Sequence, residues 1–331
     1  MNHMRARGEL EYMKPALSHQ NLLQRLSDRG LNIGSEERAL RYLRHIGYYR
    51  LSPYAIPFQK RNTEHEFKAD VSFDNLLDLY IFDRSLRLLV LDALERIEVS
   101  VRSAMSDYMS ETYSDPHWYT SLKHFKNTAV HNSLIKIMRN ACESQLKRKA
   151  ESSKMELNYP SALEHYLTTY KTPELPPSWL MIETLTIGQL EMTYRNLKLR
   201  KDKTAIAKTL GLTAPVLESW LKSYVRVRNI CAHHGRLWNA GLGAYPLIPT
   251  SSTIYWLQNQ PIHESSRLRL YPVLVSLQSV LSVISPRSSW ADRLYELVNE
   301  RPTMNLRGMG FPEGWYEDSF WEEPLLQRDF R

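Results

Sequence analysis

The sequence predicts an almost entirely α-helical protein. Glycine is scarce, with 12 residues in 331, which favours helices over turn-rich β structure. Several segments carry apolar residues at helical spacing between capping residues, and none shows the apolar–polar alternation of a half-buried strand. The chain is 43% hydrophobic and 24% charged, which is typical of a globular protein with a sizeable core.

A helical N-terminal region is expected over residues 1–65. Ser18 is placed to cap a short helix that ends at Gly30, and Ser35 to cap a second helix that runs toward Gly47. Residues 48–58 are aromatic and contain Pro53 and Pro57, so we expect this segment to be too broken for a regular helix. Its rings either pack against the next domain, which we favour, or offer a surface for base stacking.

The main helical domain is expected over residues 66–285. Its longest helical pattern spans residues 72–110, a basic helix follows over 130–150, and a further helix over 178–199. A short helix should then end near Gly211.

Two more helices are expected over residues 264–300, with an interruption at 285–286. Residues 286–331 are expected to form a C-terminal helix and a tail rich in Trp, Phe and Pro. The tail could cover the protein's own fold or a partner subunit.

One helix, between Thr213 as N-cap and Gly235 as stop, carries the most informative stretch of the chain. Pro215 lies in its first turn. At about 100° per residue, its apolar stripe consists of Leu217, Trp220, Tyr224, Val227 and Cys231. The opposite face consists of Lys222, Arg226, Asn229 and His233.

Arg228 lies on the flank between the two faces, and His234 lies near the apolar stripe, where a structural role is expected. A basic face opposite an apolar stripe is usually only a solvated face. Here, however, the face carries Asn and His rather than Lys and Glu, and the polar, aromatic segment 236–239 follows. Arg and Asn bind phosphate, and His transfers protons near neutral pH. These residues are what a metal-free RNA-cleaving site would need.

The segment Arg228-Asn229-x-x-x-His233 matches the R-x4–6-H motif of the HEPN superfamily, which has a polar residue after the arginine. The wider string over residues 228–239 resembles the abortive-infection (Abi-like, AbiD/AbiF) family of bacterial phage-defence proteins. Further blocks resemble this family in the same order, so that the resemblance covers about residues 14–285; they lie at residues 14–17, 46–54, 82–87, 94–98 with Arg102, and 177–188.

The resemblance implies a HEPN-type helical bundle with a helical N-terminal region and a C-terminal helical extension. It implies a metal-independent endoribonuclease whose catalytic residues are Arg228, Asn229 and His233. Glu98 and Arg102 either help to orient this site or form a surface ion pair at i,i+4 spacing. Arg226 is better aligned with His233 on the helical wheel than Arg228 is. Arg228 is preferred as the catalytic arginine on the resemblance alone. Arg226 and His234 are further supporting candidates.

RNA carries its own nucleophile, the 2′-hydroxyl group, so a histidine and an arginine suffice for cleavage to a 2′,3′-cyclic phosphate. One histidine per chain is a poor acid–base pair, and a homodimer that joins two motif helices would supply the second. A small non-coding RNA or an antitoxin could hold such an enzyme inactive. The alternatives are a non-catalytic RNA-binding protein that uses the same basic face, and a polar face buried in a dimer interface.

Composition restricts the partners. The formal net charge of +7 favours an anionic partner such as RNA. Candidate RNA contacts are Lys222, Arg236, Lys147, Arg148 and Lys201. Cys142 and Cys231 alone cannot form a disulfide framework or a cysteine-based zinc site, and no cofactor or metal motif is present. Without a signal-peptide core or a spanning apolar run, the protein is expected to be cytoplasmic and away from membranes.

Overall fold

The protein is described here by a computed structural model that covers residues 11–61, 64–151, 160–301 and 304–326. Within these residues there are thirteen α-helices and no β-strand, with strand-like pairing limited to isolated bridges. The predicted all-α fold is therefore confirmed. Contacts divide the chain into two compact units, Met1–Asp83 and Arg84–Arg331. The expected boundary between residues 65 and 66 lies inside the first unit, and residues 286–326 belong to the second.

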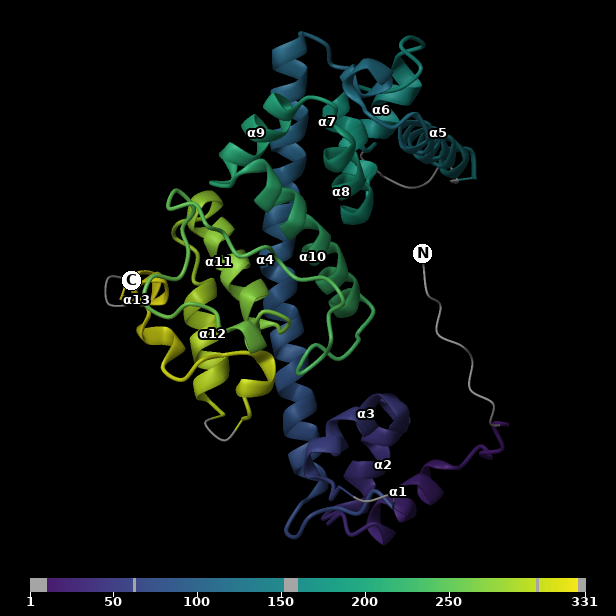
Figure 1. Cartoon of the computed structure of the whole chain (residues 1–331). Helices are drawn as coiled ribbons and strands as arrows, with labels where there is room; N and C mark the ends of the chain where they lie inside the picture. The colour runs from purple at the N-terminus through teal and green to yellow at the C-terminus, as the bar shows by residue number, and fades with distance from the viewer. Residues whose placement is uncertain (1–10, 62–63, 152–159, 302–303, 327–331) are drawn as a thin grey trace. The chain divides into compact units, whose positions relative to one another are not determined.

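The first unit contains helices α1 (His19–Asp28) and α2 (Glu36–His45), which pack against each other (Figure 1). Both predicted N-caps are confirmed. The Ser18 and Ser35 hydroxyl groups accept hydrogen bonds from the backbone N–H groups three residues later, at 3.1 and 3.3 Å. Leucines from both helices are buried in a core that continues into residues 67–77, so burial holds these short helices together.

The expectation that residues 48–58 are too broken for a regular helix is wrong. This segment forms helix α3 (Tyr48–Ala55) and the 3-10 helix Ile56–Phe58 despite its prolines. Pro53 has no N–H group for the carbonyl of Tyr49, and the Ser52 hydroxyl group donates to that carbonyl at 3.3 Å instead. Tyr54 is buried, and its hydroxyl group donates to the Asp83 carboxylate at 2.5 Å. Packing therefore prevails over base stacking at this tyrosine.

Helix α4 (Phe73–Tyr113) follows the predicted long pattern and continues into the second unit. In that unit α10 packs against α8, α9 and α11 (Figure 1). The helices after α4 are α5 (Thr128–Glu151), α6 (Ala162–Thr169), α7 (Ser178–Met181), α8 (Ile187–Asn196), α9 (Arg200–Thr209), α10 (Ala214–Ala232), α11 (Tyr271–Ile284), α12 (Trp290–Asn299) and α13 (Ser319–Leu326).

The prediction of a single helix over residues 178–199 is wrong. The segment forms α7, a 3-10 helix (Ile182–Thr184) and α8 instead. Thr186 and Gln189 form a capping box that starts α8. The carbonyl groups of Ile182 and Leu185 accept hydrogen bonds from the buried Arg102 guanidinium. A distant side chain on α4 thus compensates the break.

The C-terminal tail covers the protein's own fold. The Trp321 indole N–H donates to the Tyr271 hydroxyl group at 3.0 Å, and Asp318 accepts hydrogen bonds from the backbone N–H groups of residues 258–260 and of Phe320. Burial by itself would raise the pKa of Asp318, but these four N–H groups together lower it below its usual range. The carboxylate therefore stabilises the fold fully above the ordinary Asp pKa of about 3.9, and this contribution is lost as the pH falls through the lower folded-state value.

Candidate functional site

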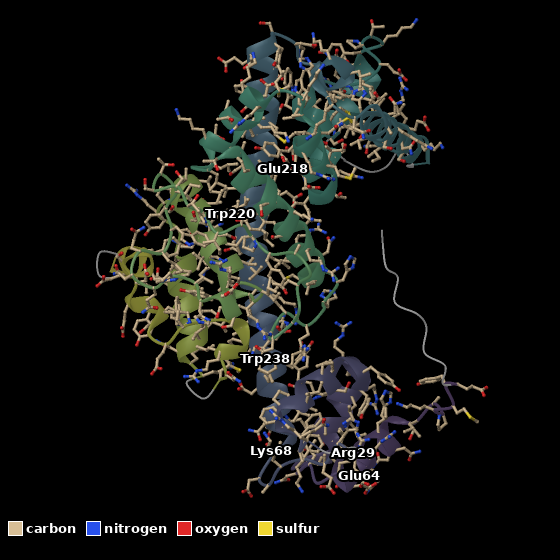
Figure 2. All side chains as sticks on the ribbon, viewed as in Figure 1. Arg29, Glu64, Lys68, Glu218, Trp220 and Trp238 are labelled. Carbon is tan, nitrogen blue, oxygen red and sulfur yellow. The ribbon has the colours of Figure 1, made fainter. Side chains whose placement is uncertain are left out.

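The motif helix α10 is built on the predicted apolar stripe. All five stripe residues are at most 2% exposed, which confirms the helical wheel; they are Leu217, Trp220, Tyr224, Val227 and Cys231. Thr213 precedes the helix in an extended conformation and Pro215 lies in its first turn, but the Thr213 side chain forms no capping hydrogen bond. The Trp220 indole, labelled in Figure 2, donates to the carbonyl of Leu247 at 2.8 Å.

The end of α10 differs from the prediction. The helix ends at Ala232, with His233 as C-cap, and His234 takes the left-handed conformation that was expected of Gly235. The Gly235 N–H group donates to the carbonyl of Ile230 at 2.8 Å and closes the turn. Because His234 lies beyond the last helical residue, the wheel does not apply to it. It is exposed rather than packed near the apolar stripe.

The three motif residues lie within six residues of one another at this end of α10, where Arg228 and Asn229 are in the last turns and His233 is the C-cap. His233 is exposed, and Arg228 and Asn229 are half-buried. Within the described part of the chain, the side chains of Arg228, Asn229 and His233 form no hydrogen bond or ion pair. Polar side chains without an internal partner are available to bind a ligand.

Arg226 differs from Arg228 in what it contacts. Its Nε atom donates to the carbonyl of Leu242 at 2.8 Å, next to Gly243, so it ties the loop after α10 back to the helix. Ser219 anchors the same loop, because its hydroxyl group accepts from the Leu247 N–H group at 2.9 Å. The arginine best aligned with His233 on the wheel therefore has a structural partner.

The polar and aromatic segment after α10 is anchored rather than loose. Leu237 and Trp238 are buried, and Figure 2 labels Trp238 on this part of the ribbon. Asn239 has a positive φ of 49° and packs on the backbone of Gly308, where a Cβ atom would lie 2.3 Å from the Asn239 side-chain oxygen. Arg236 is half-buried. The C-terminal segment thus helps to hold the motif loop.

Glu98 and Arg102 form the expected ion pair, but Arg102 is only 7% exposed, so it is not a surface pair. Besides Glu98, the guanidinium binds the carbonyl groups of Ile182 and Leu185 ahead of α8. Because α8 packs against α10, this arginine positions the scaffold of the motif helix and does not belong to its polar face.

The candidate RNA-binding residues are dispersed. Lys147 is exposed on α5, and the side chain of Arg148 lies outside the described residues. Lys201 on α9 lies over the Tyr113 ring, 5.8 Å from its centroid. Lys222 lines a cavity together with members of the basic run after residue 197, and with Lys126 and Arg195. The run is evident in the sequence, but Lys126 and Arg195 could not be found there, since nothing local marks either residue as part of a site.

Within residues 11–61, 64–151, 160–301 and 304–326, the structure contains neither a metal-binding cluster nor a membrane-spanning helix. These ranges contain no group of three or more His, Cys, Asp and Glu placed to hold a metal ion. None of their helices combines the length and the apolar character needed to cross a membrane. Cys142 and Cys231 are both buried and form no disulfide, as expected of small core residues.

The family of the chain follows from comparison with known proteins. The model of the Abi-like protein family matches residues 41–239, which is more than half of the chain. The chain therefore belongs to the Abi-like protein family, which points to abortive infection, a form of phage defence. The match includes the motif string 228–239 and the blocks from residue 46 onward, whereas the block at 14–17 lies outside it. No curated protein and no solved structure matches the chain.

Proposed function

We propose that this Abi-like protein is a metal-independent endoribonuclease of the HEPN type. The observation that supports this most directly is the end of α10, where Arg228, Asn229 and His233 fall within six residues and their side chains have no partner among the described residues. His233 takes a proton from the RNA 2′-hydroxyl group or donates one to the leaving 5′-oxygen. Arg228 stabilises the extra negative charge of the pentavalent phosphate, and Asn229 holds a phosphate oxygen or the imidazole ring. The product carries a 2′,3′-cyclic phosphate.

Arg228 is preferred to Arg226 as the catalytic arginine. The guanidinium of Arg226 already binds the carbonyl of Leu242, and using it on a phosphate would release the loop. Arg228 has no such partner to give up among the residues that the structure describes.

The active form is proposed to be a homodimer. Cleavage needs both a base and an acid, and the R-x4–6-H motif supplies one histidine per chain, His233. A two-fold axis that brings the ends of two α10 helices together supplies both groups. Light scattering should give a dimer, and a stable 39 kDa monomer that remains active at high dilution would contradict this proposal. A small RNA or an antitoxin that covers the same helix end would hold the enzyme inactive.

The decisive experiment is RNA cleavage by wild type and His233→Ala, with His19→Ala as control. His19 is an exposed histidine at the start of α1, so the control loses the same side chain from a site without a proposed role. We expect His233→Ala to lose cleavage and phage defence while it keeps its fold and most of its RNA affinity. Cleavage by wild type should persist in EDTA. Full activity of His233→Ala would refute the catalytic role, and RNA binding without any cleavage by wild type would indicate a non-catalytic RNA-binding protein.

A further inference from the structure

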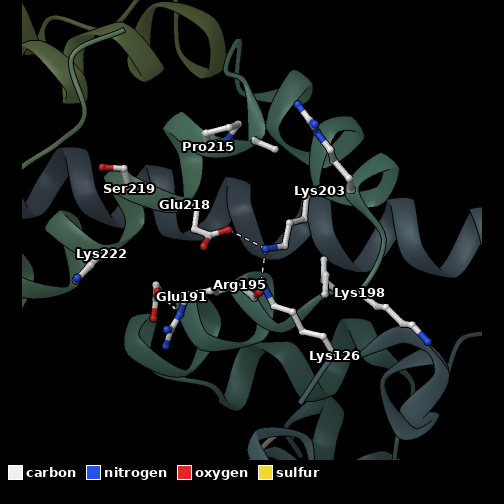
Figure 3. Close-up of a pocket in the computed structure, with 12 residues that line it drawn as sticks. Lys126, Glu191, Arg195, Lys198, Lys203, Pro215, Glu218, Ser219 and Lys222 are labelled. Atoms are coloured by element: carbon white, nitrogen blue, oxygen red, sulfur yellow. Dashed lines mark hydrogen bonds and ion pairs between the residues drawn. The ribbon is translucent and has the colours of Figure 1, made fainter. Parts of the chain in front are cut away.

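A cavity of about 830 Å³ lies at the opposite end of α10 from the motif, in the range of ligand-binding pockets (Figure 3). Its lining comes from α8, α9, the connection between them, α10 and the segment before α5. Six basic side chains line it: Lys126, Arg195, Lys198, Arg200, Lys203 and Lys222.

The carboxylates of the cavity are already paired. Glu218 accepts a hydrogen bond from the Lys203 ammonium at 2.7 Å, and that ammonium also donates to the carbonyl of Arg195 at 2.8 Å. Glu191 pairs with the Arg195 guanidinium at 3.0 Å. Figure 3 shows both ion pairs on the cavity wall.

Four of the six cations therefore remain unneutralised. No ion pair with a described carboxylate involves Lys126, Lys198, Arg200 or Lys222. Partial desolvation lowers the pKa of the otherwise exposed Lys126, the neighbouring Lys203 ammonium lowers it further, and the Glu218 carboxylate opposes this shift. A bound anion would relieve this repulsion.

Two helix N-termini add to the positive potential. Ala214 and Pro215, the first two residues of α10, line the cavity, as does Arg200, the first residue of α9. Neither N-cap, Leu199 nor Thr213, supplies a side-chain hydrogen bond. The backbone N–H groups in the first turns of α9 and α10 therefore have no acceptor from an N-cap side chain. An anion can accept their hydrogen bonds instead.

We propose that this cavity is a binding site for the phosphoryl groups of a nucleotide, separate from the motif end of α10. Lys222 and His233 are eleven residues apart in the sequence, which is about 16 Å along a helix. A strand that rises about 3.4 Å per nucleotide would cover this distance in roughly five nucleotides. The phosphate can therefore belong to an RNA strand that also reaches the motif, or to a free nucleotide. Binding here requires no cleavage, so the inference does not depend on the ribonuclease activity.

The test measures binding of inorganic pyrophosphate and of a 5′-phosphorylated RNA octamer to the full-length chain at low salt. All proteins carry His233→Ala so that the RNA stays intact. The cavity variant is Lys126→Gln with Lys198→Gln. The matched control is Lys136→Gln with Lys208→Gln, two exposed lysines outside the cavity, which changes the net charge equally.

We expect the cavity variant to bind at least tenfold more weakly and the control to stay within about twofold of the parent, since a lost contact to a charged group costs on the order of one tenfold step or more. Weakening with pyrophosphate identifies a site for free phosphoryl ligands, and weakening with the octamer alone identifies the RNA strand as the source. The proposal would be overturned if the parent protein bound neither ligand. It would also be overturned if the cavity variant and the control bound with equal affinity. Because pyrophosphate cannot be cleaved by a ribonuclease mechanism, failure of the nuclease proposal would leave this result unaffected.

Discussion

Arg102→Ala is expected to destabilise the second unit strongly. The substitution removes a guanidinium that is 7% exposed and leaves the Glu98 carboxylate and two carbonyl groups, of Ile182 and Leu185, without their donor. Removal of one partner from a buried ion pair costs about 3–5 kcal/mol, because the remaining charge is uncompensated. For a unit of this size, 1 kcal/mol shifts the melting temperature by about 2–4 °C, so we expect a decrease of roughly 6–20 °C.

Tryptophan fluorescence during thermal unfolding reports this transition, because all eight tryptophans lie in the second unit. Arg139→Ala is the matched control. Arg139 pairs with Glu174 at 3.6 Å, and both side chains are more than half exposed, so its loss should cost less than about 1 kcal/mol. In the double variant Arg102→Ala, Glu98→Ala, part of the loss should be recovered, since no half-buried carboxylate remains without its partner. Equal melting temperatures for Arg102→Ala and Arg139→Ala would refute the positioning role.

Three further outcomes are expected. In RNA cleavage assays, Arg228→Ala should be inactive, whereas Arg226→Ala should still cleave. Arg226→Ala should also loosen the loop after α10, which limited proteolysis would detect as faster cutting of the chain there. Cleavage by Arg228→Ala but not by Arg226→Ala would show that Arg226 is the catalytic arginine. Gly211→Ala should lower the free energy of unfolding by at least about 1–2 kcal/mol in urea titrations, because Gly211 has a φ of +71° and a Cβ atom there would lie 2.7 Å from Val283; an unchanged midpoint would contradict this. Acid should loosen the C-terminal tail as the pH falls through the lowered pKa of Asp318, and Asp318→Asn should remove this part of the acid sensitivity in tryptophan fluorescence; identical acid transitions of the two proteins would exclude it.

Features that depend on neighbours within about four residues could be predicted from the sequence. The N-caps Ser18 and Ser35 and the stop at Gly211 are predictable because their partners are local. The apolar stripe of α10 follows from helical periodicity alone. The string around Arg228 and His233 likewise predicts the Abi-like family, because the motif is one short, continuous run of residues.

Features that depend on distant contacts could not be predicted in this way. The helical propensity of residues 178–199 is continuous, and the break at 182–186 needs Arg102, some eighty residues away, to satisfy the freed carbonyl groups. The helix α3 survives its proline because Leu51 and Tyr54 are buried in the first unit. Burial and compensating hydrogen bonds outweigh local propensity at both places.

The sequence by itself determined the helical class of this protein, its apolar stripes and caps, and its family, because each of these depends on a short run of residues. Only the tertiary structure decided which charges meet. It tied Arg226 to a loop carbonyl and left Arg228 unengaged, and it gathered Lys126 with Lys222 around one cavity. Electrostatic interactions act through space over several ångströms, so residues that share a potential need not be neighbours in the chain.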